Sequence, residues 1–193
     1  MDIIFATSNA HKASEVNNIL GVDQCQLKTL KDIGFTDDIA ETGTTLNENA
    51  WIKTDHIHTL YGGHVIAEDT GLEVFALNMQ PGVYSARYAG SQRSDQDNMN
   101  KLLDALSSTS DRTAQFRTVV ALILNGERHT FDGIVKGHIA KARSGNGGFG
   151  YDPIFVPDGY DQSFGMLPAK VKNSISHRGR AFQKVAKFLA RVK

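Results

Sequence analysis

The feature that most constrains the fold is a pair of long extended segments in the middle of the chain. Residues 115–124 are rich in β-branched and apolar side chains, and residues 128–139 form a second extended run. Asn125-Gly126 stands between them, and Asn-Gly is a strong signal for a two-residue hairpin turn. The sequence therefore predicts a long β-hairpin.

Helices and strands alternate on the amino-terminal side of this hairpin. Residues 3–6 have the short apolar run of a buried strand, and residues 10–20 carry apolar side chains at helical spacing. The further elements expected are a helix at 45–60 that opens with the capping box Thr45-x-x-Glu48, a strand at 65–67 with extended chain at 72–75, a turn at Pro81-Gly82, a helix at 94–106, a strand at 153–156 and a helix at 176–191. This pattern predicts a mixed α/β fold with a long central twisted mixed sheet and helices, and 193 residues suit a single domain over 1–193.

Composition limits the kinds of partner that the protein is expected to bind and the cellular compartment in which it is expected to act. Lys plus Arg number 21 and Asp plus Glu number 21, so the chain lacks the basic excess of a nucleic-acid or membrane-surface binder. Cys25 is the single cysteine, and we expect a packed thiol in a cytoplasmic protein, since residues 22–30 have the pattern of a strand or its approach. No apolar run approaches the roughly 18 residues of a membrane span, and the first residues lack the basic start of a signal peptide.

Two polar segments suggest a site for phosphate and metal. Thr7-Ser8-Asn9-Ala10-His11-Lys12 lies between an expected strand and an expected helix, where backbone N–H groups and a lysine can bind an anion. The same residues would also serve as a helix cap with a solvated lysine. Glu41 and Glu68-Asp69 stand beside glycine turns, and carboxylates from separate segments can hold Mg²⁺ together with water and phosphate oxygens. Acids also cap turns and helices, so both interpretations stay open.

Two further segments suggest a site for a base. The glycine-rich loop that ends in Phe149-Gly150-Tyr151-Asp152 offers an aromatic face, although it also suits a flexible hairpin with a packed aromatic ring. Lys172, His177 and Arg178 place cations at the start of the last helix, which the helix dipole disfavours unless an anion joins them. A solvated basic helix start is the alternative. Together the four segments describe a nucleotide phosphate site without revealing the reaction or the base.

Six segments in order make the chain resemble the inosine triphosphate pyrophosphatase family, also called the non-standard purine NTP pyrophosphatases. They are Ala6-Thr7-Ser8-Asn9-Ala10-His11-Lys12 with Glu15; Glu41-Thr42-Gly43-Thr44-Thr45-Leu46-Asn47-Glu48-Asn49-Ala50 with Lys53; Glu68-Asp69-Thr70-Gly71-Leu72-Glu73-Val74; Pro81-Gly82-Val83-Tyr84-Ser85-Ala86-Arg87-Tyr88; Gly148-Phe149-Gly150-Tyr151-Asp152-Pro153-Ile154-Phe155; and Lys172-Asn173 with Ile175-Ser176-His177-Arg178. The resemblance runs nearly end to end. It implies two lobes around an active-site cleft, usually in a homodimer, and hydrolysis of ITP, dITP and XTP to the nucleoside monophosphate and pyrophosphate.

The resemblance also implies a role for each site residue. Glu41 and Asp69 would bind Mg²⁺, and Asp69 would be the catalytic base that activates water. The substrate-binding residues it implies are Thr7, Ser8, Asn9, Ala10, His11, Lys12 and Lys53 at the phosphates, Thr70 at the substrate, Phe149 stacked on the purine, Gly150, Tyr151 and Asp152 around the base and sugar, and Lys172, His177 and Arg178 at the 6-oxo edge of the base, with Arg87 as a further candidate. A donor facing the 6-position would favour a carbonyl over the amino group of adenine.

The sequence departs from the family pattern at two places. Thr70 stands where the family usually has serine, which keeps the hydroxyl, and residues 163–171 lack the usual acids. Three other functions stay open: a pyrophosphatase for modified pyrimidine or methylated nucleotides, a catalytically silent nucleotide-binding protein, and a nucleic-acid-binding module built on the basic last helix. The segment from Lys172 to Arg178 favours purines over the first, and the retained Glu41, Lys53 and Asp69 argue against the second.

Overall fold

The computed structural model describes residues 1–20 and 25–192. Its strands are β1 (Asp2–Phe5), β2 (Gln26–Thr29), β3 (Val65–Val74), β4 (Gln80–Gly82), β5 (Thr113–Leu124), β6 (Glu127–Ile139) and β7 (Phe155–Pro157). Its α-helices are α1 (Ala10–Leu20), α2 (Leu46–Tyr61), α3 (Asp95–Ala105), α4 (Ala169–Ile175) and α5 (His177–Leu189). No helix among the described residues is long and apolar enough to cross a membrane.

The strands form one mixed sheet in the order β2-β1-β3-β5-β6-β7, with β4 paired to β3. β1 runs parallel to β2 and β3, whereas β4 is antiparallel to β3 and β7 is antiparallel to β6. Helices between parallel strands and a hairpin in the middle confirm the predicted mixed α/β class.

Packing divides the chain into two compact units. The first consists of Met1–Asp69, Thr118–Gly133 and Arg178–Lys193, and the second of Thr70–Arg117 and Ile134–His177. The chain passes from one unit to the other within β3, β5, β6 and the first turn of α5. Each unit has its own hydrophobic core.

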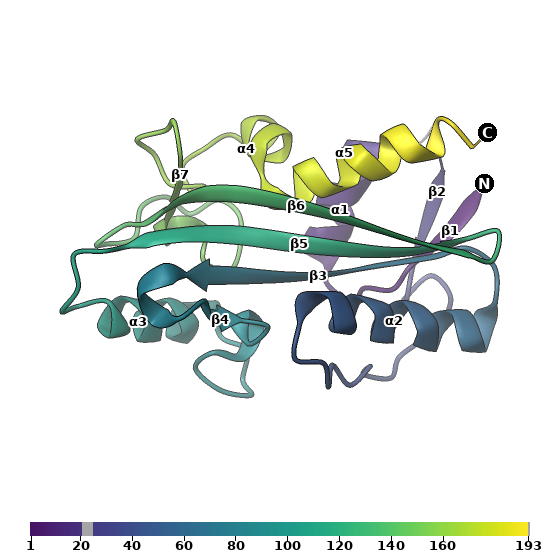
Figure 1. Ribbon diagram of the computed structural model, residues 1–193, viewed down its shortest axis with the longest axis horizontal. Helices are drawn as coiled ribbons and strands as arrows, with labels where there is room; N and C mark the ends of the chain where they lie inside the picture. Colours follow the sequence, from purple (N-terminus) through teal and green to yellow (C-terminus); the bar gives the residue numbers. More distant parts are fainter. Residues whose placement is uncertain (21–24, 193) are drawn as a thin grey trace. The chain divides into compact units, whose positions relative to one another are not determined.

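In the first unit, helices cover both faces of the sheet (Figure 1). α1 and α5 lie on one face and α2 lies on the other. The core on the first face consists of Ala13, Val16 and Leu20 of α1, Ala181, Phe182, Val185 and Leu189 of α5, and Ile3, Phe5, Ile66, Val120, Leu122 and Leu124 of the strands, together with Cys25. Cys25 is buried in the same core, as predicted, while residues 22–24 before it lie outside the described part.

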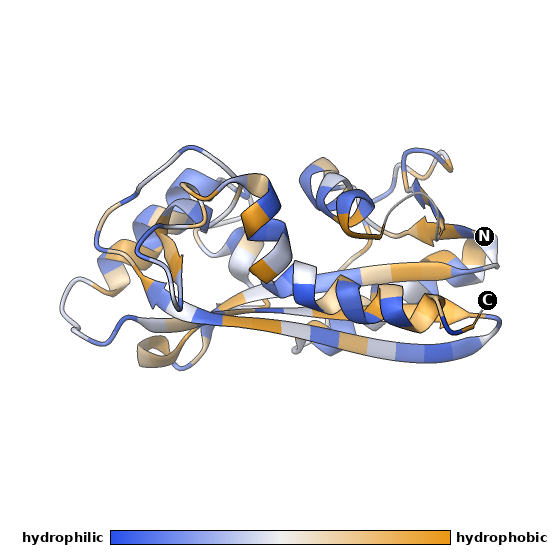
Figure 2. Ribbon diagram, turned by 90° about the horizontal axis from the view of Figure 1, so that it is seen from above, coloured by the Kyte–Doolittle hydropathy of each residue, from blue (hydrophilic) through white to orange (hydrophobic). Residues whose placement is uncertain are grey.

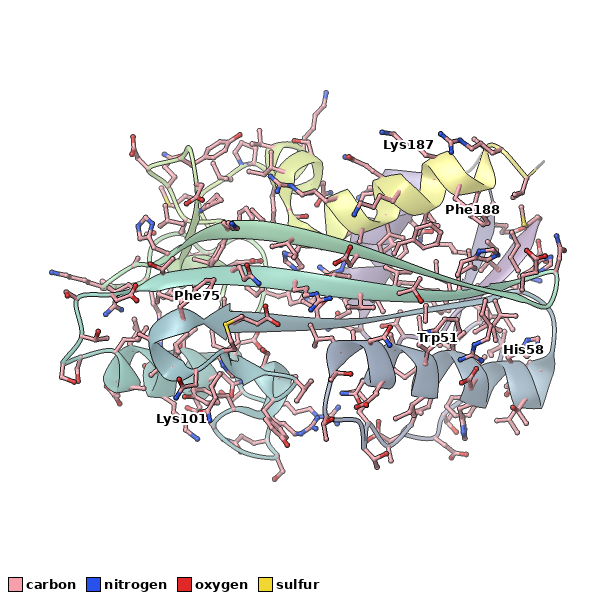
Figure 3. The ribbon with its side chains drawn as sticks, viewed as in Figure 1. Trp51, His58, Phe75, Lys101, Lys187 and Phe188 are labelled. Atoms are coloured by element: carbon pink, nitrogen blue, oxygen red, sulfur yellow. The ribbon has the colours of Figure 1, made fainter. Side chains whose placement is uncertain are left out.

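α5 shows how the helices present an apolar stripe to the sheet. Hydrophilic and hydrophobic residues alternate around it in Figure 2. Phe182 packs edge-on against Phe5, with ring centroids 5.9 Å apart. Phe188 lies against Phe131 of β6, whereas Lys187 is exposed and points away from the sheet (Figure 3). These contacts fix the helix whose first turn carries His177 and Arg178.

The predicted hairpin is confirmed in β5 and β6. Asn125 and Gly126 have φ of 52° and 81°, the positive values that a type I′ turn requires at both positions. Arg128, just after the turn, pairs with Asp55 of α2 at 2.6 Å and lies 3.8 Å from the ring centroid of Trp51 (Figure 3). The turn end of the hairpin is therefore joined to α2 within the first unit.

The core of the second unit lies between β3, β5, β6 and α3. It contains Leu72, Val74, Met99, Leu102, Leu106, Ala114, Phe116, Val135, Ile139, Tyr151, Ile154, Phe155 and Phe164. The N-cap Ser94, whose side chain accepts from Asp97 N–H, begins α3 as predicted.

Four expected elements differ from the structure. The strand expected at 153–156 is β7 over Phe155–Pro157, and the residues before it form the 3-10 helix η3 (Asp152–Ile154), because Pro153 cannot donate a strand hydrogen bond and suits a first helical turn. Residues 65–74 form one strand, so Glu68 and Asp69 lie inside β3 rather than at its end. Pro81-Gly82 belongs to the short strand β4, which pairs with β3 so closely that a Cβ on Gly71 would meet Gly82 O at 2.6 Å. The last helix begins one residue later than expected, and α4, which the periodicity did not reveal, precedes it.

Candidate active site

Two acids and a lysine meet in the first unit. Lys53 Nζ donates to Glu41 Oε1 at 2.5 Å and lies 3.4 Å from Asp69 Oδ1. Lys53 and Asp69 are buried, with exposed fractions of 8% and 7%. The structure therefore brings together Glu41 and Asp69, the predicted metal ligands, and Lys53, the predicted phosphate-binding residue. Asp69 is also the predicted catalytic base.

Helix α2 positions the lysine. Thr45 and Glu48 form the predicted capping box, in which Thr45 Oγ1 accepts from Glu48 N–H and the Glu48 carboxylate accepts from Thr45 N–H. Asn49 and Lys53 are four residues apart, so their side chains lie on the same face of the helix, and both reach Asp69. Asn49 Nδ2 donates to Asp69 Oδ2 at 3.1 Å.

Burial and charge act in opposite directions on these groups. Burial raises the pKa of Asp69 above the ordinary value of 3.8, although Lys53 and Lys12 oppose the shift. Burial lowers the pKa of Lys12 despite the nearby Glu68 carboxylate. For Lys53, burial is outweighed by Asp69 and Glu41, which raise the pKa of its ammonium. The proton affinity of the Asp69 carboxylate is thus increased.

The donor set fits Mg²⁺. Glu41 and Asp69 both contact one cationic atom, Lys53 Nζ, so their oxygens converge on a common point. Mg²⁺ is usually held by one or two carboxylates, with water and substrate phosphate oxygens completing an octahedron. Within residues 1–20 and 25–192, no three His, Cys, Asp or Glu side chains gather as a complete metal cage. Glu41 and Asp69 match the one or two carboxylates that Mg²⁺ usually takes from a protein.

A second buried network lies in the same unit. Arg178 donates from Nε to Glu68 Oε1 at 2.8 Å and from Nη1 to Glu15 Oε2 at 2.6 Å. Lys12 Nζ lies 3.4 Å from Glu68 Oε1. The two carboxylates raise the pKa of Arg178 although burial opposes them. Arg178 is thus anchored inside the first unit, and its contact with a base stays a prediction.

The segment from Thr7 to Lys12 forms the N-terminus of α1. Asn9 Oδ1 accepts from the N–H groups of His11 and Lys12 at 3.0 and 3.2 Å, and Thr7 Oγ1 accepts from Asn9 N–H at 3.2 Å. The helix cap that the sequence offered as an alternative is therefore present. Ser8, Ala10 and His11 are exposed, and phosphate binding by this segment stays a prediction.

In the second unit, Asp152 joins Lys172 to the loop of Phe149. Asp152 Oδ2 accepts from Lys172 Nζ at 2.6 Å and from Phe149 N–H at 2.8 Å. Lys172 Nζ also lies 5.0 Å from the centroid of the Phe149 ring. A Cβ on Gly148, where φ is 74°, would collide with Asp152 Oδ2, so glycine is required there. Three predicted base-site residues therefore form one cluster.

Tyr151, Gly150 and His177 are the other residues of the second unit that were predicted to bind the purine or the sugar. Tyr151 is buried and donates from its hydroxyl to Ser85 O at 2.9 Å, and burial raises its pKa. Gly150 N–H donates to Asp95 Oδ2 at 2.7 Å. His177 is buried, and its ring stacks on Phe116 with centroids 4.5 Å apart. Tyr151 is thus a packed aromatic ring, as the alternative interpretation of this loop expects.

Thr70 and Arg87 complete the predicted set. Thr70 is half-buried in β3, directly after Asp69. Arg87 lies in the 3-10 helix η2 (Ser85–Arg87), and its guanidinium carbon is 5.3 Å from the centroid of the Tyr84 ring.

Sequence reasoning did not single out Asn49 or Glu15. Asn49 belongs to one of the family segments, and it is fully buried and contacts Asp69. An asparagine within a helix is unfavourable unless its amide finds a specific partner, and this is the signal that identifies such a residue.

Comparison with known proteins places this chain in a family. The model of the Ham1 family matches residues 3–188. The chain is 46% identical over 193 residues to the dITP/XTP pyrophosphatase of Flavobacterium johnsoniae, covering 100% of both proteins. It is 43% identical over 191 residues to the dITP/XTP pyrophosphatase of Bacillus subtilis, covering 97% of this chain and 96% of the relative. The chain belongs to the Ham1 family, which confirms the resemblance drawn from the sequence.

Solved structures give the same answer. The Ham1 protein of Staphylococcus aureus is similar with a TM-score of 0.91 and 39% identity, covering 100% of both chains. The HAM1 protein of Coxiella burnetii also has a TM-score of 0.91, with 36% identity and 99% of each chain covered. The fold is therefore that of the Ham1 proteins.

Proposed function

We propose that this chain is a Mg²⁺-dependent hydrolase that cleaves the non-standard purine nucleotides ITP, dITP and XTP to the nucleoside monophosphate and pyrophosphate. Membership of the Ham1 family supports the proposal, as do full-length relatives named dITP/XTP pyrophosphatase. The observation that carries it is the setting of Asp69, whose two oxygens are contacted separately by Lys53 and Asn49 in a buried site.

The residues of the first unit would carry out the hydrolysis. Glu41 and Asp69 would hold Mg²⁺, which supplies Lewis-acid polarisation of phosphate oxygens when bound. Asp69 accepts the proton of the attacking water. Lys12 and Lys53 neutralise charge on the phosphates, which lowers the barrier to attack by water.

The residues of the second unit would recognise the base. Phe149 stacks on the purine, and Lys172 donates to the 6-oxo group. An ammonium has three donors, so Lys172 can bind Asp152 and a carbonyl oxygen at the same time. Because the amino group of adenine offers no acceptor at this position, the site favours ITP, dITP and XTP over ATP.

We also propose that the protein acts in the cytoplasm as a homodimer. A single, buried cysteine suits a reducing compartment. In the second unit, Phe75, Met79 and Tyr84, close to one another in sequence around β4, are 43%, 39% and 54% exposed. A group of exposed apolar side chains is a common feature of protein–protein interfaces, and it would be covered in a dimer.

Release of pyrophosphate tests the proposed function. The purified protein is incubated with Mg²⁺ and ITP, dITP, XTP, GTP or ATP, and pyrophosphate and monophosphate are quantified. We expect a preference for the first three nucleotides and loss of activity with EDTA. If a folded, Mg²⁺-loaded protein releases no pyrophosphate from any of them, the chain is a binding protein and the proposed function is wrong.

A further inference from the structure

Asn49 is a buried polar residue of α2 that contacts Asp69 of the candidate site. Its exposed fraction is 0%. Its Oδ1 accepts from Gly43 N–H at 2.8 Å, and its Nδ2 donates to Asp69 Oδ2 at 3.1 Å. One side-chain amide thus joins the strand that carries Asp69 to the loop that carries Glu41, two residues before Gly43.

Lys53 makes the same connection one helical turn later. It contacts Glu41 Oε1 and Asp69 Oδ1, whereas Asn49 contacts Gly43 N–H and Asp69 Oδ2. The two oxygens of Asp69 therefore have different partners, which come from positions four apart on one face of α2. Two contacts on opposite oxygens fix the plane of a carboxylate, where one contact would leave it free to rotate about its terminal bond.

The packing around this connection leaves little room for adjustment. A Cβ on Gly43 would lie 2.6 Å from Glu48 Cβ and 2.7 Å from Asn49 Oδ1. The capping box of Thr45 and Glu48 holds the first turn of α2, so the backbone that carries Asn49 is also restrained. The loop at Gly43 and the capped first turn of α2 therefore both restrain the position of the amide.

We propose that Asn49 is a positioning residue for the metal and water site: its amide orients the Asp69 carboxylate and keeps the loop of Glu41 in register with it. This inference rests on the proposed function, because it assigns Asn49 to the acids that would hold the metal and activate water. Asn49 acts through Asp69 and the loop rather than on the substrate. Its loss would therefore lower kcat and metal affinity and leave the KM for the nucleotide unchanged at saturating Mg²⁺.

The chemistry of the amide explains the choice of asparagine. An amide of this length offers an acceptor to Gly43 N–H and a donor to the Asp69 carboxylate at the same time. Aspartate would keep the acceptor and the volume but would lose the donor and add a like charge beside Asp69. Groups that hydrogen-bond to metal ligands typically account for about 10- to 100-fold in metal affinity or activity.

The test compares Asn49→Ala and Asn49→Asp with Asn47→Ala and Asn47→Asp. Asn47 is exposed in the same turn of α2, so it is a matched control for helix propensity and added charge. Mn²⁺ binding to each nucleotide-free protein is followed by the loss of the electron paramagnetic resonance signal of free Mn²⁺. The kcat and KM for ITP are measured with saturating Mg²⁺, and circular dichroism reports the folded fraction.

We expect Asn49→Ala to weaken Mn²⁺ binding by about 10- to 100-fold. We expect Asn49→Asp to lower kcat by a similar factor without a change in KM, while both Asn47 variants behave as wild type. If Asn49→Ala instead binds less Mn²⁺ per chain with an unchanged Kd, the variant is partly unfolded and the inference is wrong. A kcat of Asn49→Asp equal to that of wild type would overturn it as well, because this variant still accepts from Gly43 N–H. Failure of the wild-type protein to bind Mn²⁺ or to hydrolyse ITP would instead refute the proposed function.

Discussion

Arg178 donates from Nε to Glu68 at 2.8 Å, and side-chain exposures of 1% and 0% leave neither partner access to water. Glu15 provides a second carboxylate at 2.6 Å, and Lys12 approaches Glu68. Charges in such a setting depend on one another, because removing one partner leaves another buried and uncompensated. The network fixes the start of α1 and the first turn of α5 relative to β3 inside the first unit.

Replacing Arg178 by methionine should therefore destabilise the protein strongly. We expect the free energy of unfolding to fall by about 3–5 kcal/mol, because Glu68 and Glu15 lose a buried partner. Lys184→Met is the matched control on the same helix, since the side chains of Lys184 and its partner Asp132 are 56% and 43% exposed. That change should cost about 1 kcal/mol or less. Equal effects in urea unfolding would show that the buried network does not contribute to stability.

The capping box of α2 predicts a pH-dependent contribution to stability. Hydrogen bonds from Thr44 N–H, the Thr44 hydroxyl and Thr45 N–H hold the pKa of Glu48 below its ordinary value of 4.5. A carboxyl whose pKa is lower in the folded state stabilises the fold above the unfolded pKa and loses this effect as the pH falls through the folded pKa.

Glu48→Gln should accordingly be less stable than wild type at pH 7, and the difference should shrink as the pH falls below about 4.5. Thermal unfolding of both proteins from pH 7 to pH 3 measures this difference. A constant difference over that range would mean that the charge of Glu48 does not contribute to the cap.

The cluster of Phe149, Asp152 and Lys172 should control the choice of base. We expect Lys172→Met to lower kcat/KM for ITP by about 10- to 100-fold and to change the value for ATP much less, because one hydrogen bond from a charged donor is lost. Lys170→Met, at an exposed lysine of the same helix, is the control. An unchanged ratio of the two nucleotides would exclude Lys172 from recognition of the base.

Short sequence patterns predicted most helices, strands and turns, because the preferences that determine these elements are themselves local. The bounds of α1, 10–20, followed from apolar spacing, and the turn at Asn125-Gly126 followed from the need for positive φ at both positions. β3 was divided in the prediction because Glu68 and Asp69 interrupt an apolar run. In the structure these acids are buried within the strand. Their charges are compensated by Lys53 and Arg178, which come from other segments of the chain.

The site was predicted in part, and the missing part depends on long-range contacts. The family resemblance identified Glu41, Lys53 and Asp69, and the structure brings them together. The pattern of the last helix could not show that Arg178 pairs with Glu15, which is 163 positions away in the chain. Asn49 was not singled out for the same reason, since its role comes from Asp69 and Gly43 on other segments.

The most direct test of the account is the rate of pyrophosphate release from ITP by Asp69→Asn in saturating Mg²⁺, compared with wild type. Asparagine keeps the size of the side chain but cannot accept a proton at neutral pH. We expect a folded variant whose kcat is lower by about 10²–10⁴-fold, the range of general base catalysis. A variant that is folded and retains the wild-type rate would contradict the assignment of Asp69 as the base.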